Sequence, residues 1–316
     1  MPAKKRVLVT GGAGFIGSNL VDRLLEKESE VIVFDNLSSG KMDFIENHLE
    51  NPDFSFIKGD LLDPEAIEKA CKDTDMVYHV AANPDVKLGA SDTKVHLDQN
   101  ILATYNLLEA MRKGSAKKIA FTSTSTVYGE ASIMPTPENY GPLIPISLYG
   151  ASKLACEALI TSYSHTFDMQ AWIFRFANIV GPRSTHGITV DFIKKLKENP
   201  RKLEILGDGK QEKSYLHVSE CVNAILFAIE KNKKEVNIFN IGSEDTISAT
   251  EIGKIVVEEM GLSDVEFTYT GGSRGWKGDV PRMRLGIEKL KAIGWKPEYT
   301  SERSVRETAR AVIDKR

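Results

Sequence analysis

Tyr149 and Lys153 stand four residues apart in a stretch whose pattern predicts a helix, so their side chains share one face. A tyrosine hydroxyl beside a lysine ammonium can act as a general base toward an alcohol. Ionising a tyrosine at pH 7 costs ~4 kcal/mol. One positive charge about 5 Å away returns roughly 3 kcal/mol at an effective dielectric of 20. Lys153 alone therefore falls short, and a second positive charge is needed to create the base.

A glycine-rich segment near the N-terminus predicts a phosphate cradle. Residues 10–17 follow a short apolar run and contain Gly11, Gly14 and Gly17. Glycines at these positions allow a tight turn, close approach of a pyrophosphate and close packing of a helix on a strand. The free N–H groups at the start of that helix attract phosphate charge. Asp35 lies 21 residues after Gly14, where a carboxylate accepts hydrogen bonds from an adenosine ribose and repels a 2′-phosphate; we predict NAD rather than NADP.

Apolar runs and amphipathic helical patterns alternate through the first half of the chain. The runs that we interpret as strands are residues 7–10, 31–35, 54–58, 76–80, 119–123 and 172–176. Consecutive Val, Ile and Phe are typical of strands covered on both faces. Long helices are expected at about 94–112 and 148–167. Repeated strand–helix units predict an α/β fold with a doubly wound parallel sheet of the Rossmann type.

The alternation becomes irregular after Phe176, where turn signals accumulate. Strands are expected at 215–218 and 236–241, and Ser248 with Glu251 forms a capping box that opens a helix. We expect residues 1–177 and about 213–241 to form the NAD-binding domain. Residues of about 178–212 and 242–316 are expected to form a smaller C-terminal α/β lobe that binds substrate.

The composition argues against several functional classes. Lys and Arg total 41 against 44 Asp and Glu in 316 residues, a formal net charge of −3, which disfavours a nucleic-acid binder or a polybasic membrane binder. The three cysteines form no CxxC pair and the six histidines show no metal-ligand spacing, so we expect no disulfides and no metal. No run of 18 apolar residues suggests a membrane span, and residues 7–10 are too short for a secretory signal. We expect a cytoplasmic protein.

Several motifs in chain order identify a family resemblance. They are the glycine-rich segment 10–17, Asp60-Leu61, residues 79–82, residues 123–129, and the Tyr149/Lys153 pair. Over essentially its whole length the chain resembles the extended short-chain dehydrogenase/reductase family, and within it the nucleotide-sugar epimerases of the UDP-glucose 4-epimerase type. The resemblance implies cofactor contacts at Gly11, Gly14, Phe15, Ile16, Gly17, Asp35, Asn36, Asp60, Leu61, Ala81, Ala82, Asn100, Ser123, Tyr149 and Lys153.

The resemblance adds Thr124 to Tyr149 and Lys153 as a third catalytic residue. Its hydroxyl can donate and accept at once, and so can relay a proton between a sugar 4-hydroxyl and Tyr149. The nicotinamide ring of NAD⁺ would supply the second positive charge. Dehydratases of the family carry an Asp-Glu pair after this position and decarboxylases usually keep a Glu, whereas this chain has Ser125 and Thr126. A 4-keto intermediate then has one expected fate, which is to take the hydride back on the opposite face with inversion of C4.

The implied substrate is a UDP-sugar held by its nucleotide diphosphate, because a ketone that rotates must be bound from a distance. The family motifs map substrate contacts to Thr124, Asn178, Arg183, Lys213 and Arg274. Lys213-Ser214 departs from the usual Arg-Asp, and Arg274 is displaced from the usual position of an Arg. A lysine keeps the charge but loses the bidentate phosphate geometry. The resemblance also implies a homodimer through the helices at 94–112 and 148–167.

Two other functions remain open. One is an NAD-dependent dehydrogenase or reductase of another sugar or alcohol, which would form NADH stoichiometrically. The other is a catalytically silent NAD-sensing binding protein on the same scaffold. Such proteins commonly lack the Tyr–Lys pair, and its presence here favours an enzyme.

Overall fold

The computed structural model describes residues 4–276 and 278–314. The chain divides into two compact units. Unit 1 consists of the residues up to Val127, Ser147–Arg175 and Ile225–Phe239. Unit 2 consists of Tyr128–Ile146, Phe176–Ala224 and the residues from Asn240 onward.

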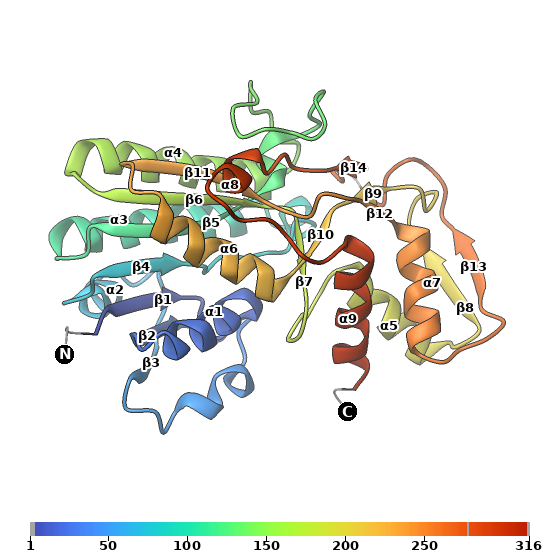
Figure 1. Ribbon diagram of the computed structural model, residues 1–316, viewed down its shortest axis with the longest axis horizontal. Helices are drawn as coiled ribbons and strands as arrows, with labels where there is room; N and C mark the ends of the chain where they lie inside the picture. Colours follow the sequence, from blue (N-terminus) through green and yellow to red (C-terminus); the bar gives the residue numbers. More distant parts are fainter. Residues whose placement is uncertain (1–3, 277, 315–316) are drawn as a thin grey trace. The chain divides into compact units, whose positions relative to one another are not determined.

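A seven-stranded sheet with the strand order β11-β6-β5-β4-β1-β2-β3 forms the centre of unit 1 (Figure 1). The bounds are β1 Arg6–Thr10, β2 Glu30–Asp35, β3 Phe54–Lys58, β4 Met76–His79, β5 Lys118–Thr124, β6 Gln170–Phe176 and β11 Val236–Ile241. β1 runs parallel to both β2 and β4, with Val9 opposite Val33 and Tyr78. From β1 the order runs outward to β3 on one side and to β11 on the other. The predicted doubly wound parallel sheet is confirmed.

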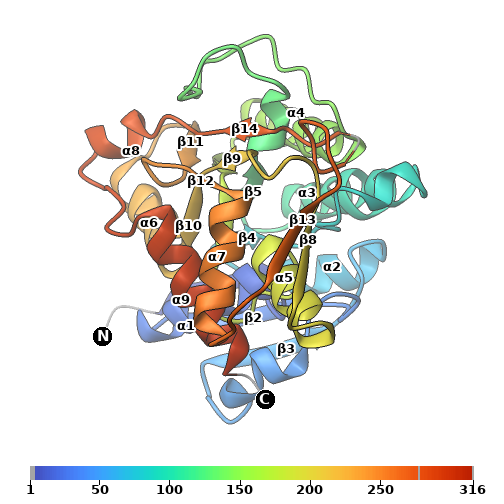
Figure 2. The same ribbon diagram turned by 90° about the vertical axis from the view of Figure 1, so that its right-hand side faces the viewer.

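Helices cover both faces of this sheet (Figure 2). One layer contains α2 Pro64–Cys71, α3 Ala103–Lys113 and α4 Leu148–Phe167, which pack side by side; the other contains α1 Phe15–Glu26 and the C-terminal half of α6 Val218–Lys231. Asp63 caps α2 by accepting from two backbone N–H groups, and Ser147 caps α4 by accepting from the Gly150 N–H. These caps satisfy donors that a helix start leaves open.

The core of unit 1 explains the apolar runs of the sequence. Leu8 and Val9 on β1 and Ile173 on β6 are fully buried, as are Leu107 of α3 and Ile160 of α4. Successive residues of a central strand point to opposite faces, and here both faces are covered by helices. Alternating polar residues would leave unsatisfied groups against one of the two helix layers.

Unit 2 is built from short strands, helices of its own and the first half of α6. β7 Asn178–Val180 pairs with β10 Tyr215–His217; β9 Glu212–Lys213 lies between β12 Ile247–Ser248 and β14 Arg282–Met283; β8 Lys202–Ile205 pairs with β13 Glu266–Tyr269. The helices within its described residues are α5 Ile188–Glu198, α7 Ala249–Glu259, α8 Glu288–Ala292 and α9 Ser301–Ile313. Phe192, Ile252 and Val305 form part of its core.

The structure differs in detail from two of the expectations. The helix expected at 94–112 begins with a π-helical turn, Leu97–Leu102, before α3. Of the range 213–241 that the sequence assigned to the NAD-binding domain, β11 lies in the seven-stranded sheet, whereas β9 and β10 pair with strands of unit 2. The functional division of the chain stays a prediction. Within the described part of the chain, no helix combines the length and the apolar character of a membrane span.

Candidate active site

The glycine-rich turn links β1 to α1 and is folded tightly. Gly11 has φ +70°, and a Cβ there would lie 2.6 Å from the Ala81 nitrogen. A Cβ on Gly17 would lie 2.1 Å from the Gly11 carbonyl oxygen. Gly14 precedes α1 without capping it by a side chain, so the first N–H groups of α1 (Phe15, Ile16 and Gly17) have no side-chain cap. A crowded turn ahead of an uncapped helix start fits a bound pyrophosphate.

The carboxylate of Asp35 lies against this turn at the end of β2. It accepts hydrogen bonds from the Ala13 N–H at 3.0 Å and the Leu37 N–H at 2.8 Å. Burial raises the pKa of Asp35, and the two N–H groups oppose that rise. The carboxylate is therefore oriented by the turn and keeps lone pairs for ribose hydroxyls. Its side of the turn carries no arginine for a 2′-phosphate, since Asn36 follows and donates to Asp60 at 3.0 Å. The residues present thus fit NAD.

The other expected cofactor contacts lie after β3 and β4. Leu61 is only 8% exposed and packs into the core of unit 1. Ala81 and Ala82 follow β4, with the Ala81 nitrogen next to Gly11. Asn100 is buried in the π-helical turn, where it accepts from the Asn83 N–H at 2.9 Å. All of these residues belong to unit 1.

Asn100 also reaches the helix that carries Tyr149 and Lys153. Its Nδ2 donates to Ser152 Oγ at 2.9 Å, so one amide joins the loop after β4 to the first turns of α4. Lys153 is 2% exposed, and its Nζ donates to the Thr122 carbonyl oxygen of β5 at 2.8 Å. Burial lowers the pKa of Lys153 to about 8. Thr124 lowers the pKa of Tyr149, so the two side chains lie close together, and with Lys153 they stand at the carboxyl end of β5.

The pKa of Tyr149 in the folded protein is higher than the neighbouring charges alone would predict. Burial raises the pKa of Tyr149 to about 12, and the hydrogen bond with Thr124 offsets only part of that rise. The charge of Lys153 by itself would offset most of the cost of ionising Tyr149 if desolvation were absent. In the folded protein, desolvation outweighs the favourable interaction, although Tyr149 keeps part of its surface exposed; its ring lies 5.6 Å from the His96 ring, centroid to centroid. Tyr149 is therefore protonated at neutral pH before any ligand binds.

Ser123, an expected cofactor contact, is 3% exposed and donates to the Glu157 carboxylate. Glu157 of α4 is paired with Arg175 of β6, at 2.7 Å between Nη2 and Oε2. Sequence reasoning missed this pair. Two signals could have found it: Glu157 stands four residues after Lys153 on the same helix face, and Arg175 interrupts a strand expected to be buried. A charge in such a strand requires a partner.

Four of the expected substrate contacts belong to unit 2, and hydrogen bonds or ion pairs connect three of them, Asn178, Lys213 and Arg274, through neighbouring residues. Lys213 Nζ is 2.6 Å from the buried carboxylate of Asp279, and Arg274 donates to the Asp279 carbonyl oxygen at 2.7 Å. Arg274 also pairs with Glu130. Asn178 Nδ2 donates to the carbonyl oxygen of Ser214, the neighbour of Lys213, at 3.1 Å.

Arg183 lies in the turn after β7, with a left-handed φ of 69°. A non-glycine residue held in this region stores strain, and such residues cluster at functional sites. The described contacts do not link Arg183 to Lys213 or Arg274. Its role stays a prediction.

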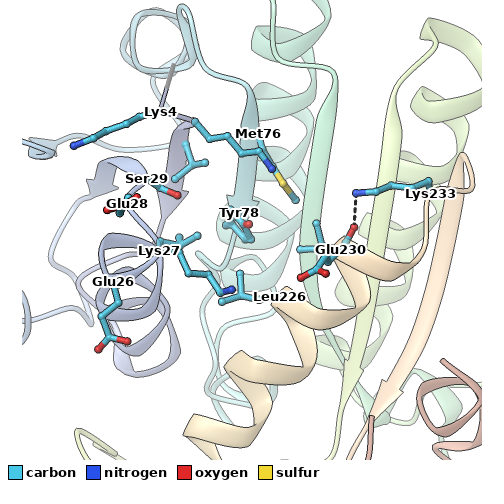
Figure 3. A pocket seen from close by; sticks show the side chains of 14 residues that line it. Lys4, Glu26, Lys27, Glu28, Ser29, Met76, Tyr78, Leu226, Glu230 and Lys233 are labelled. Atoms are coloured by element: carbon cyan, nitrogen blue, oxygen red, sulfur yellow. Dashed lines mark hydrogen bonds between the residues drawn. The ribbon is translucent and has the colours of Figure 1, made fainter. Parts of the chain in front are cut away.

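A hollow of unit 1 lies away from these residues (Figure 3). It is lined by the starts of β1 and β4 and by the ends of α1 and α6, with Tyr78 at its centre. These are the amino ends of the strands, whereas the glycine-rich turn, Asp35 and Thr124 lie at carboxyl ends. Ligands of doubly wound sheets bind at the carboxyl ends. Among the described residues, no cluster of three or more His, Cys, Asp or Glu could hold a metal.

The glycine-rich turn leads to a test of the cradle. Gly17→Ala places a methyl group 2.1 Å from the Gly11 carbonyl oxygen, so the turn must open. We expect NAD affinity to fall by at least tenfold in calorimetric titration. Gly286→Ala is the matched control, because its Cβ has no neighbour closer than 3.5 Å. Unchanged affinity in the Gly17 variant would contradict the assigned cradle.

Comparisons with known proteins agree with this geometry. The NAD dependent epimerase/dehydratase family matches residues 7–242. A protein of Methanocaldococcus jannaschii that is named provisionally as a UDP-glucose 4-epimerase is 36% identical over 95% of this chain and 96% of its own. A solved UDP-galactose 4-epimerase is 41% identical, covers 98% of both chains and superposes with a TM-score of 0.88.

The relatives do not share one reaction. UDP-glucuronic acid decarboxylase 2 of Arabidopsis thaliana is 32% identical over 93% of this chain and 65% of its own. These relatives nevertheless match 93% to 98% of this chain, and the matching family is NAD-dependent. The chain therefore belongs to the NAD-dependent epimerase/dehydratase family, the extended short-chain dehydrogenases/reductases that its motifs indicate, and its cofactor is NAD.

Proposed function

We propose that this enzyme inverts C4 of a UDP-hexose of the UDP-glucose/UDP-galactose type through a transient 4-keto sugar. The observation that carries the proposal is the meeting of Tyr149, Thr124 and Lys153 at the end of β5. The next positions, Ser125 and Thr126, bring no carboxylate for elimination or decarboxylation. At these two positions an oxidised sugar meets no carboxylate that would carry it onward, so we expect it to be reduced again.

Each of the three residues has a role in this reaction. Tyr149 takes the proton of the sugar 4-hydroxyl and returns it at the end of the cycle. Thr124 holds the same oxygen and passes the proton, since its hydroxyl can donate and accept. Lys153, four residues further along α4, stabilises the ionised form of Tyr149 by its positive charge. NAD, when bound, takes up the C4 hydride and gives it back, and its oxidised ring adds positive charge that favours an ionised Tyr149.

The raised pKa of Tyr149 explains why a second positive charge is needed. Lowering a pKa from about 12 to 7 requires about 7 kcal/mol of preferential stabilisation of the phenolate. A single lysine does not supply this amount. Ionisation of Tyr149 therefore needs a second positive charge, which oxidised NAD would supply when bound; the proton that Tyr149 then takes up comes from the sugar 4-hydroxyl. The cofactor is recycled within one turnover and is not consumed.

The nucleotide diphosphate is assigned to unit 2. Lys213 and Arg274 are brought together by Asp279, and they provide two cations for two phosphates. Asp279 and Glu130 partly neutralise these cations before substrate binds. Binding through the diphosphate leaves the sugar free to present either face. The names of the similar epimerases support a UDP-sugar as the substrate.

A panel of UDP-sugars tests the reaction. We expect UDP-galactose and UDP-glucose to interconvert, with product stereochemistry read by NMR, and no net absorbance of NADH at 340 nm. N-acetylated and uronic forms complete the panel. Stoichiometric NADH would identify a dehydrogenase, carbon dioxide from UDP-glucuronate a decarboxylase, and tight NAD binding without turnover a sensing protein.

The role of Tyr149 is tested by removing one oxygen atom. Tyr149→Phe should lower kcat by at least 100-fold and leave the affinity for NAD within a factor of about three, because the base is lost and the cradle is not touched. Tyr163→Phe is the control on the same helix, since its hydroxyl bonds to Glu109 instead. Turnover close to the wild-type value in the Tyr149 variant would refute the base.

We also propose a homodimer through α3 and α4. Leu97, Leu102 and Tyr105 are 52%, 43% and 44% exposed along the π-helical turn and α3, an apolar row that a second copy would cover. Tyr105→Glu should shift the sedimentation coefficient from dimer to monomer, and Leu49→Glu, at a separate exposed position, should not. A wild-type protein that sediments as a monomer at micromolar concentration would contradict the proposal.

A further inference from the structure

A buried ion pair lies one helical turn beyond Lys153. Glu157 and Arg175 are each 4% exposed, and the guanidinium holds the carboxylate by three contacts: Nε to Oε1 at 3.0 Å, Nε to Oε2 at 3.2 Å, and Nη2 to Oε2 at 2.7 Å. The Ser123 hydroxyl donates to the same carboxylate. The pair thus joins three elements, α4, β5 and β6, directly behind Thr124.

Stability alone does not account for such a pair. Desolvating two charges costs as much as their attraction returns, and apolar residues of similar volume commonly serve a fold equally well. The surrounding core of unit 1 is apolar, including Ile160 on the same helix and Ile173 on the same strand. The position of the pair offers another explanation, because Tyr149, Lys153 and Glu157 follow one another at intervals of four residues on one face of α4.

The groups around Lys153 leave Glu157 as its anionic neighbour among the described residues. The groups that interact with it electrostatically are His79 from β4, His96 from the segment before α3, and Cys156 and Glu157 from α4. Tyr149 precedes it by four residues on α4, and Arg175 is paired with Glu157. Burial lowers the pKa of His79 to about 3 and that of His96 in the same direction, so both are neutral. Burial raises the pKa of Tyr149 and of Cys156, which are neutral as well.

We propose that Glu157, fixed by Arg175 and Ser123, is a positioning residue that keeps the buried Lys153 protonated and holds the Thr124 end of β5 against α4. The contribution to turnover rests on the proposed function. The electrostatic part stands without it, because it concerns two side chains of the ligand-free protein. Arg175 serves by holding the Glu157 carboxylate in place.

The sign of the effect follows from the charges. Burial lowers the pKa of Lys153 to about 8, while the carboxylate of Glu157 opposes that fall. Glu157→Gln removes the negative charge and leaves the guanidinium of Arg175 unbalanced nearby. Both changes disfavour the ammonium, so the pKa of Lys153 should fall by about 1 to 3 units. Lys153 would then lose its proton near neutral pH, and the alkaline limb of the kcat profile would move down by a similar amount.

The direct measurement is a pH titration of ¹³C-labelled lysines by NMR in the ligand-free protein. The Lys153 signal is the one that disappears in Lys153→Arg. We expect its midpoint to move down in Glu157→Gln and to stay in Glu259→Gln, a carboxylate of α7 that also pairs with arginines. Glu157→Asp should restore part of the shift. A Lys153 midpoint that does not move in Glu157→Gln would overturn the proposal.

A second variant tests the proposal if Glu157→Gln does not fold. Glu157→Leu with Arg175→Leu replaces the pair by apolar side chains and should keep a cooperative unfolding transition. Its Lys153 midpoint should still lie below the wild-type value, with kcat reduced at least tenfold at pH 8. A folded double variant with an unchanged midpoint would also overturn the proposal. If no UDP-sugar is turned over by the wild-type protein, the proposed function fails while the titration still decides the role of Glu157.

Discussion

The hydrogen bond from the Lys153 ammonium to the Thr122 carbonyl oxygen, 2.8 Å long, is the contact on which the candidate active site depends. It connects α4 to β5 through a charge that is almost fully buried. A buried ammonium is costly unless it is bonded and balanced, so its position is sharply determined. The register between helix and strand follows from it, and that register brings Tyr149 to Thr124. The chemistry of the site is thus set by how one helix lies along one strand.

A second buried network connects the phosphate cradle to the same helix. Thr10, directly before the glycine-rich turn, is bonded to His79 at 2.8 Å, and the other ring nitrogen of His79 is bonded to Thr104 of α3 at 3.0 Å. Thr104 in turn contacts Cys156 of α4. Because every member is buried and partnered, the network favours a single arrangement. Cofactor cradle and catalytic helix therefore form one hydrogen-bonded body within unit 1.

Unit 2 follows a different electrostatic design. Its candidate phosphate-binding cations are balanced in advance, Lys213 by Asp279 and Arg274 by Glu130. Such pairing lowers the cost of holding cations together without a ligand, and it moderates the gain when phosphate arrives. Ser214, where the family usually has Asp, is fully buried and bonded to Ser243. This substitution therefore belongs to the interior of unit 2 and does not alter its charged surface.

The sequence by itself determined what local spacing can carry: the parallel sheet, the glycine-rich turn, Asp35 beside it, and the placement of Tyr149 and Lys153 on one helix face. Backbone geometry converts such spacings directly into positions. Only the tertiary structure decided the partners that lie far apart in the chain, Glu157 with Arg175 and Lys213 with Asp279. It also decided the acidity of Tyr149, because desolvation depends on everything packed around a group, and a count of neighbouring charges leaves that cost out.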